Sequence, residues 1–186
     1  MLKKTILSLA FLFFFLALKA QYTQIGNGAF ASFFYGPMST IDSTPYFNRH
    51  AYIYPAASMD NIVHGDTIRS LEFMRTGSDT LAGTAAFRIY LKNSSKADFG
   101  AAAINWKAEA RDSGMQLVFN DHPRAYIGSS PGLVRFDFKP QDYFVFDTSG
   151  GAIHLQVLVE YTQQANQVNP IAWFNESSFS VSGFVS

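Results

Sequence analysis

The stretch Leu133–Tyr161, LVRFDFKPQDYFVFDTSGGAIHLQVLVEY, decides the fold of this chain. It contains two runs that alternate apolar and polar residues, Leu133–Lys139 and Ala152–Tyr161, and a short aromatic run between them, Tyr143–Phe146. A strand with one buried face and one wet face shows this period-two alternation. The stretch therefore predicts strands joined by turns.

The last run predicts which side chains of its strand are buried. The buried face would carry Ile153, Leu155, Val157 and Val159. The wet face would carry His154, Gln156 and Glu160. The segment before this run, Asp147–Gly151, is a turn signal because glycine adopts positive φ at little cost.

Most of the chain repeats this pattern. Further strands are expected at Tyr22–Phe34, Ala51–Tyr54, Thr67–Arg75, Ala85–Lys92, Met115–Phe119 and Phe179–Val185, and Asn169-Pro170 breaks the chain before Ala172–Phe174. In Ala85–Lys92 the inward residues would be Phe87, Ile89 and Leu91. The best helix candidate is Ala101–Ala110. Many short strands with little helix predict an all-β antiparallel sandwich, jelly-roll-like, with an Ig-like sandwich as the alternative.

The first twenty residues, MLKKTILSLAFLFFFLALKA, have the pattern of a secretory signal peptide. Lys3 and Lys4 precede an apolar run of about 13 residues, Ile6–Leu18, which is shorter than the roughly 20 residues that span a bilayer as a helix. Cleavage after Ala20 would leave residues 21–186 as a single domain without a transmembrane segment. The alternation of Phe179–Val185 up to the last residue predicts a terminal edge strand or a continuation past Ser186.

Composition limits the classes of function. The chain has no cysteine, which excludes disulfides, a thiol nucleophile and a lipoprotein anchor. Removing Lys3, Lys4 and Lys19 from the 14 basic residues leaves 11 against 14 acidic residues, a net charge of −3. The basic residues are scattered, so nothing predicts nucleic-acid binding.

Several segments together resemble a β-sandwich domain of exported Bacteroidota proteins. They are Ile25–Gly28, Ala51–Met59, Gly65–Phe73, Phe87–Lys92 and Phe144–Val159, and the resemblance covers roughly Ile25 to Phe174. It implies a non-catalytic, jelly-roll-like domain, often placed beside peptidase or adhesin modules and upstream of a sorting domain for type IX secretion. It also implies secretion or display at the cell surface, with the periplasm as the alternative location.

Aromatic residues make up 16% of the chain, which favours a binding role. Exposed rings stack on sugars or anchor protein interfaces. The candidate ligand-binding rings are Tyr46, Tyr54 and Trp173, which lie near expected loops or strand ends. The alternative is that these rings fill a core that has no disulfides.

Two metal sites are conceivable from residue types. His64, Asp66 and His122 supply the two histidines and one carboxylate that hold non-haem iron on jelly-roll-like scaffolds. Loop oxygens of Asp60, Asn61 and Asp66 could hold calcium, although no EF-hand spacing supports it. Both His64–Asp66 and Asp121–Pro123 also fit ordinary turns.

Gly128–Gly132 spells G-x-S-x-G, the nucleophile elbow of α/β-hydrolases. Asp142 or Asp147 and then His154 follow Ser130 in the order of a triad. However, the oxyanion hole needs the backbone N–H of the residue after the serine, and Pro131 has none. The segment therefore predicts a turn and no catalytic residue.

The sequence predicts an exported, non-catalytic binding or adhesion module for an extracellular polysaccharide or protein. The alternatives are a non-haem metal-dependent enzyme and a structural domain of a larger surface protein. The sequence leaves the ligand and the oligomeric state open.

Overall fold

The computed structural model describes residues 30–32, 36–38, 46–59, 61–81, 83–100, 103–163 and 171–175. The predicted signal peptide at 1–20 and the strand expected at Phe179–Val185 lie outside the described residues. Among the helices that the structure describes, none is long and apolar enough to cross a membrane.

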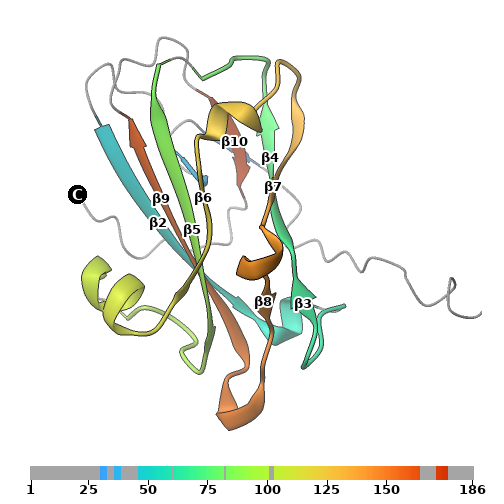
Figure 1. Ribbon diagram of the computed structural model, residues 1–186, viewed down its shortest axis with the longest axis vertical. Helices are drawn as coiled ribbons and strands as arrows, with labels where there is room; N and C mark the ends of the chain where they lie inside the picture. The colour runs from blue at the N-terminus through green and yellow to red at the C-terminus, as the bar shows by residue number, and fades with distance from the viewer. Residues whose placement is uncertain are drawn as a thin grey trace, which may run out of the picture.

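In the described part of the chain, most strands form two four-stranded antiparallel sheets packed against each other (Figure 1). Sheet A has the order β1-β10-β4-β7, with bounds Phe30–Ser32, Ala172–Asn175, Ser70–Thr76 and Gly132–Asp137. Sheet B has the order β2-β9-β5-β6, with bounds Tyr46–Pro55, His154–Gln163, Ala85–Ser94 and Gln116–Asp121. A short ladder pairs β3 (Thr67–Ile68) with β8 (Phe144–Val145). The prediction of an all-β antiparallel sandwich is confirmed.

The chain winds back and forth between the two sheets. Strands β1, β4, β7 and β10 belong to sheet A, and β2, β5, β6 and β9 belong to sheet B. Among these eight, only β5 and β6 follow each other within one sheet. An Ig-like sandwich keeps several consecutive strands in one sheet, whereas a jelly roll crosses over repeatedly. The strand order is therefore that of a jelly roll.

The helical segments among the described residues are short and lie in connections. Four of them are single 3₁₀ turns: η1 (Ala56–Ser58), η3 (Pro123–Ala125), η4 (Pro140–Asp142) and η5 (Ser149–Gly151). The fifth, η2 (Lys107–Asp112), is π-helical and follows Trp106. The sequence placed this helix at Ala101–Ala110, so its start was predicted too early. Figure 1 shows η2 beside sheet B, on the side away from sheet A.

The main core fills the space between the sheets. Phe87, Ile89 and Leu91 of β5 are 0% exposed, which confirms their predicted inward orientation. The ring of Phe87 packs against Phe136 of β7 across the sandwich, with ring centroids 4.8 Å apart. Aromatic side chains from both sheets therefore form the centre of the core.

Strand β9 is buried on both faces. The main core contains Leu155, Val157 and Val159, as predicted. The prediction was wrong for Ile153, which precedes β9 and is 53% exposed. The opposite face was expected to be wet, but Gln156 is 0% and Glu160 is 9% exposed. That expectation was wrong because Trp106 and η2 cover this face and bury Leu158 with it. Sheet B thus carries a second, smaller layer on its outer side.

Candidate functional site

Trp173, predicted to be a binding ring, lies in the core. Its exposed fraction is 0%, and its ring packs edge-on against Phe73 with centroids 6.5 Å apart. Gly36 fits against it, with φ of +125° and space so tight that a Cβ would lie 2.6 Å from the Trp173 Cβ. The prediction of an exposed ring is therefore wrong for Trp173, because β10 turns this side chain toward sheet B.

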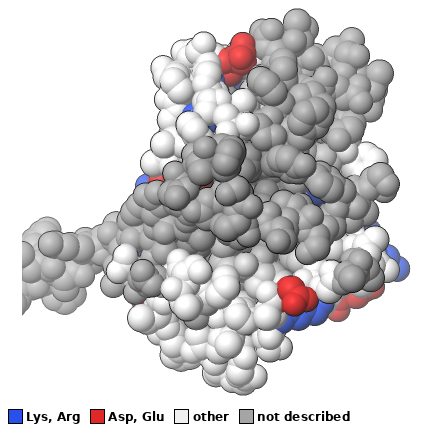
Figure 2. Space-filling model, turned by 180° about the vertical axis from the view of Figure 1, so that it is seen from behind, with Lys and Arg blue, Asp and Glu red and all other residues white. Residues whose placement is uncertain are grey.

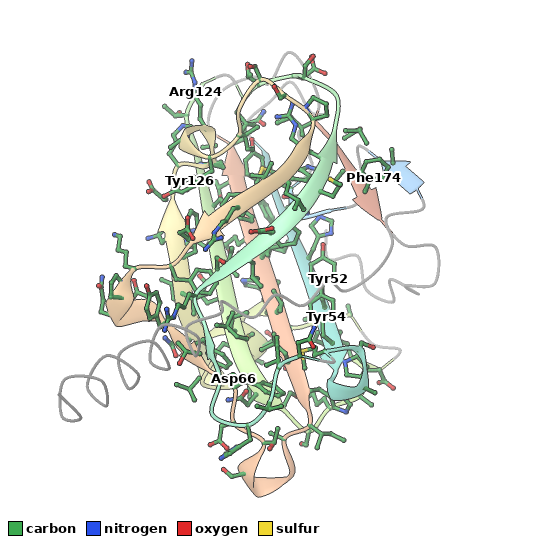
Figure 3. The ribbon with its side chains drawn as sticks, turned by 90° about the vertical axis from the view of Figure 1, so that its right-hand side faces the viewer. Tyr52, Tyr54, Asp66, Arg124, Tyr126 and Phe174 are labelled. Carbon is green, nitrogen blue, oxygen red and sulfur yellow. The ribbon has the colours of Figure 1, made fainter. Side chains whose placement is uncertain are left out.

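Tyr54 lies on the inward side of β2, next to Tyr52 (Figure 3). The two rings stack with centroids 6.0 Å apart, and both are partly buried against the main core. Burial raises the pKa of the Tyr54 hydroxyl above its ordinary value. A ligand role for Tyr54 stays a prediction. Tyr46 begins β2, but its side chain lies outside the described residues.

His64 and Asp66 each make local bonds in the loop before β3. The Asp66 carboxylate accepts the Val63 N–H at 2.8 Å, which closes a turn. His64 Nδ1 accepts the Thr148 N–H at 3.2 Å and lies 3.2 Å from Asp147. These bonds tie the loop to the segment after β8, at the end of the sandwich where Figure 3 labels Asp66.

His122 lies at the opposite end of the sandwich. Its Nδ1 caps η3 by accepting the Arg124 N–H, and its Nε2 accepts the N–H of Ala85, the first residue of β5. The far end of β5 is joined to β8 by Asn93, eight residues or roughly 26 Å further along the strand. The three proposed iron ligands therefore do not come together. Among the described residues, no group of three or more His, Asp or Glu could hold a metal. Asp60 of the calcium hypothesis lies outside them.

The G-x-S-x-G segment ends in a strand, because β7 begins at Gly132. Its first glycine carbonyl, at Gly128, accepts a 2.8 Å bond from the buried Arg75 guanidinium, which also binds the Gly77 carbonyl at 2.7 Å. This segment is a clamped turn, as the sequence predicted. His154 starts β9 at the other end of the sandwich (Figure 1).

The strongest candidate for a functional site is the outer side of sheet B. In an antiparallel ladder, residues that pair directly point to the same face. Arg49 and Arg88 both pair with Glu160, and Tyr90 pairs with Leu158, which lies under Trp106. We call this surface the arginine face and define it as Phe47, Arg49, Arg88, Tyr90, Trp106 and Glu160.

Glu160 holds the two arginines of the arginine face in place. Its Oε2 accepts the Arg49 Nε–H at 2.9 Å, and its Oε1 accepts an Arg88 Nη1–H at 2.5 Å. The Glu160 side chain is 11% exposed, whereas those of Arg49 and Arg88 are 30% and 34% exposed. The carboxylate is thus shielded beneath two guanidinium groups that reach solvent. One carboxylate against two cations leaves a local charge of +1.

Aromatic rings surround the Arg49 guanidinium. Its central carbon lies 5.1 Å from the Phe47 ring centroid and 5.2 Å from that of Trp106, within the range of cation–π attraction. Tyr90 packs edge-on against Trp106 with centroids 6.4 Å apart. Trp106 is 8% exposed, but Phe47 is 49% exposed. The face therefore presents an open ring beside fixed guanidinium groups.

Helix η2 is fastened to the sheet next to these groups. The Glu109 carboxylate accepts one hydrogen bond from Lys96 Nζ at 2.5 Å and another from the Gln156 amide of β9 at 3.0 Å. Ala110 packs on Leu158 together with Trp106. A rigid support of this kind pre-organises a binding surface and lowers the entropy lost on binding.

A second surface feature lies where the sheet edges β6 and β7 face each other, toward the viewer in Figure 1. It is a cleft of about 240 Å³ lined by Leu117, Val118, Phe119, Asn120, Asp121, Tyr126, Asp137, Lys139 and Asp142. The Tyr126 hydroxyl donates to Asp121 at 2.9 Å. Hydrogen bonds from the His122 N–H and from Tyr126 lower the pKa of Asp121, so this carboxylate is a poor general acid. The cleft is smaller than the roughly 300–1,000 Å³ of drug-sized pockets.

The arginine face was not predicted from the sequence. The segment YFNRHAYIY contains one local indication of it. Every second side chain, at Phe47, Arg49 and Ala51, points outward, and the residues between them, Asn48 and His50, point inward. The partners of Arg49 were not visible, because Glu160 lies 111 residues further along the chain. No family model, curated protein or solved structure matches the chain.

Proposed function

We propose that this chain is a non-catalytic binding module for a polysaccharide, working outside the cell or at its surface, with the arginine face as its binding site. The observation that carries the proposal is the exposed Phe47 ring beside the fixed guanidinium groups of Arg49 and Arg88. Sugars offer an apolar ring face and a rim of hydroxyls. An open aromatic ring and several N–H donors complement both.

The position of the face in the fold supports this role. It lies on β2, β9 and β5, which are ten-residue strands in continuous register, so its side chains have a rigid base. Binding sites placed on strands are held more accurately than sites on loops. The predicted signal peptide favours an exported protein, where polysaccharides are common ligands.

A non-catalytic role agrees with the arrangement of the ionisable groups on this face. Both oxygens of Glu160 are bound by arginines and 11% of its side chain is exposed, so this carboxylate is poorly placed to reach a substrate. Glycosidases also need a second carboxyl group across the scissile bond. Glu160 is the sole carboxylate among the described outward positions of the three strands, and Glu109 of the adjacent η2 is held by Lys96 and Gln156.

A glycan array with the purified protein, followed by calorimetry on the best ligand, tests the proposal. Phe47→Ala should weaken binding at least about tenfold, which corresponds to the loss of roughly 1.4 kcal/mol of stacking and burial. The matched control is Phe174→Ala, because Phe174 is also an exposed ring (38%) but lies on sheet A. It should leave binding unchanged.

Two outcomes would overturn the proposal. One is an array on which no glycan is bound, while circular dichroism shows a folded sandwich. The other is a bound glycan whose affinity falls equally in Phe47→Ala and Phe174→Ala. If Phe174→Ala alone weakened binding, the site would lie on sheet A instead.

A further inference from the structure

Positive charge is concentrated on the outer side of sheet B. The outward positions of its described strands β2, β9 and β5 carry three cations, Arg49, Arg88 and Lys92, against one carboxylate, Glu160. The whole chain has a formal net charge of 0, so this surplus is local. Seen from behind, most of the described surface bears neither acidic nor basic side chains (Figure 2).

The two arginines keep donor capacity after binding Glu160. A guanidinium has five N–H donors in a planar fork. Glu160 takes one nitrogen of Arg49 and one of Arg88, and about a third of each arginine side chain reaches solvent. A second anion placed above the pair could accept hydrogen bonds from both guanidinium groups, as carboxylates and sulfates do in charge-assisted contacts.

A third guanidinium lies near this pair. Arg111 is exposed on η2, five residues or about one π-helical turn after Trp106, whose ring packs edge-on against Tyr90. Burial and the Glu160 charge raise the pKa of the Tyr90 hydroxyl, and the charges of Arg88, Arg111 and Arg49 act against this shift. Arg111 therefore lies on the same side of sheet B as Arg49 and Arg88, on the helix that starts at the Tyr90–Trp106 contact.

We infer that the arginine face binds the acidic group of a charged polysaccharide, a carboxylate or a sulfate ester. The inference rests on the proposed function and names the class of its ligand. The Phe47 ring would stack on a sugar, and Arg49, Arg88 and Arg111 would bind the acid that the sugar carries. The aromatic ring favours a sugar polymer over a free inorganic anion, which offers no ring face to stack on.

Nucleic acid is another abundant polyanion, and its flat bases can also stack on an exposed aromatic ring. Its affinity depends on many phosphate contacts along a basic track. The arginine face and Arg111 of the adjacent η2 offer three guanidinium groups beside two carboxylates, Glu160 and Glu109, and this small number suits one acidic group better than a run of phosphates. Binding of nucleic acid is therefore an outcome that the test must detect.

The test compares four polymers by calorimetry on the intact protein: polygalacturonate, dextran sulfate, neutral dextran and single-stranded DNA. One of the two acidic sugars should bind at least about tenfold tighter than dextran, and rising salt should weaken it. Comparing polygalacturonate with dextran sulfate identifies the acid as carboxylate or sulfate.

Variants then locate the site. Arg111→Gln should weaken acidic-sugar binding by about three- to tenfold, since it removes one of three charges. This side chain is exposed and lies outside the Glu160 ion pairs, so the fold should be kept. Arg124→Gln is the matched control, because Arg124 is an exposed arginine of η3 at one end of the sandwich (Figure 3). The Arg124→Gln variant should bind the acidic sugar with the same affinity as the parent protein.

The outcomes separate the inference from the proposed function. If neutral glycans bind through Phe47 as tightly as the acidic ones, the inference fails and the proposed function stands. If no sugar polymer binds, the proposed function fails as well. Tighter binding to DNA than to either acidic sugar, or equal binding by Arg111→Gln and Arg124→Gln, would also overturn the inference.

Discussion

The outer faces of the two sheets differ in how much of their surface is exposed to solvent, although both belong to strands with alternating sequences. On sheet B, Leu158 is 0% exposed because Trp106 and η2 lie over it. On sheet A, Leu133 is 55% exposed and pairs with Met74, which is 44% exposed. The outward leucine is thus a core residue on one sheet and a surface residue on the other.

The ion pairs of the two faces differ in the same way. Glu160 of sheet B lies beneath two arginines, with 11% of its side chain exposed. On sheet A, Glu72 lies 3.6 Å from Arg135, whose side chain is 56% exposed and also binds Asp137 at 2.6 Å. Exposed pairs contribute little because water screens them. The difference arises because the connection between β5 and β6 contains Trp106 and η2, which cover the outer face of sheet B and shield its polar side chains from solvent.

The largest expected effect comes from truncating the two outward leucines. Leu158→Ala should lower the free energy of unfolding by about 2–4 kcal/mol, because it leaves a cavity under Trp106. Leu133→Ala should lower it by less than about 1 kcal/mol, because the side chain is already wet. Urea denaturation of both variants measures the difference. Equal losses would mean that the two faces are covered alike.

The next effect concerns the acidic residues. Glu160→Gln should destabilise the protein by about 1–3 kcal/mol, less than a fully buried pair would lose, because both arginines are partly solvated. Glu72→Gln should cost at most about 0.5 kcal/mol. Urea denaturation at low and high salt gives both values. A cost for Glu72→Gln that matched the cost for Glu160→Gln would contradict the contrast between the faces.

A pH titration of stability measures the contribution of one partly buried residue on the inner side of sheet B, His50 of β2. Burial lowers the pKa of His50 from 6.5 to about 4 in the folded protein. Between these values the unfolded chain binds a proton that the folded chain does not, so stability is lost as the pH falls through this window. The loss between pH 6.5 and 5 should be about 1–2 kcal/mol.

His50→Gln is the control for this titration. It removes the titrating group and should flatten the dependence between pH 6.5 and 5, since glutamine has no proton to gain. Denaturation curves of parent and variant at both pH values give the difference. An equal slope in the two proteins would show that other groups cause the loss.

Much of the fold could be predicted because apolar residues at every second position indicate a strand and identify the face that is buried. The inward residues Phe87, Ile89 and Leu91 were predicted correctly on this basis. The covered outer face was not, because Gln156 is buried next to η2 and Glu160 beneath Arg49 and Arg88, all of which are distant in the sequence. Alternation separates the two faces of a strand but does not show what covers either of them.

The candidate site depended on long-range pairing, which one sequence does not reveal. Arg49 and Arg88 meet at Glu160 from positions 111 and 72 residues away. Local spacing instead suggested His64, Asp66 and His122, which the fold separates. Trp173 was misjudged for a related reason, since a ring near a predicted loop can still point into the core, as this one does.

The smallest expected effect tests whether the sheet A face is open in solution. Met74→Thr replaces an outward, 44% exposed side chain with a β-branched residue that suits a strand. Stability should change by no more than about 0.5 kcal/mol in either direction, because little apolar area is lost and strand propensity improves. Urea denaturation and sedimentation at two protein concentrations check this. A loss above about 2 kcal/mol is the size expected for a buried methionine. It would show that Met74 is covered in solution, and the contrast between the two outer faces would no longer hold.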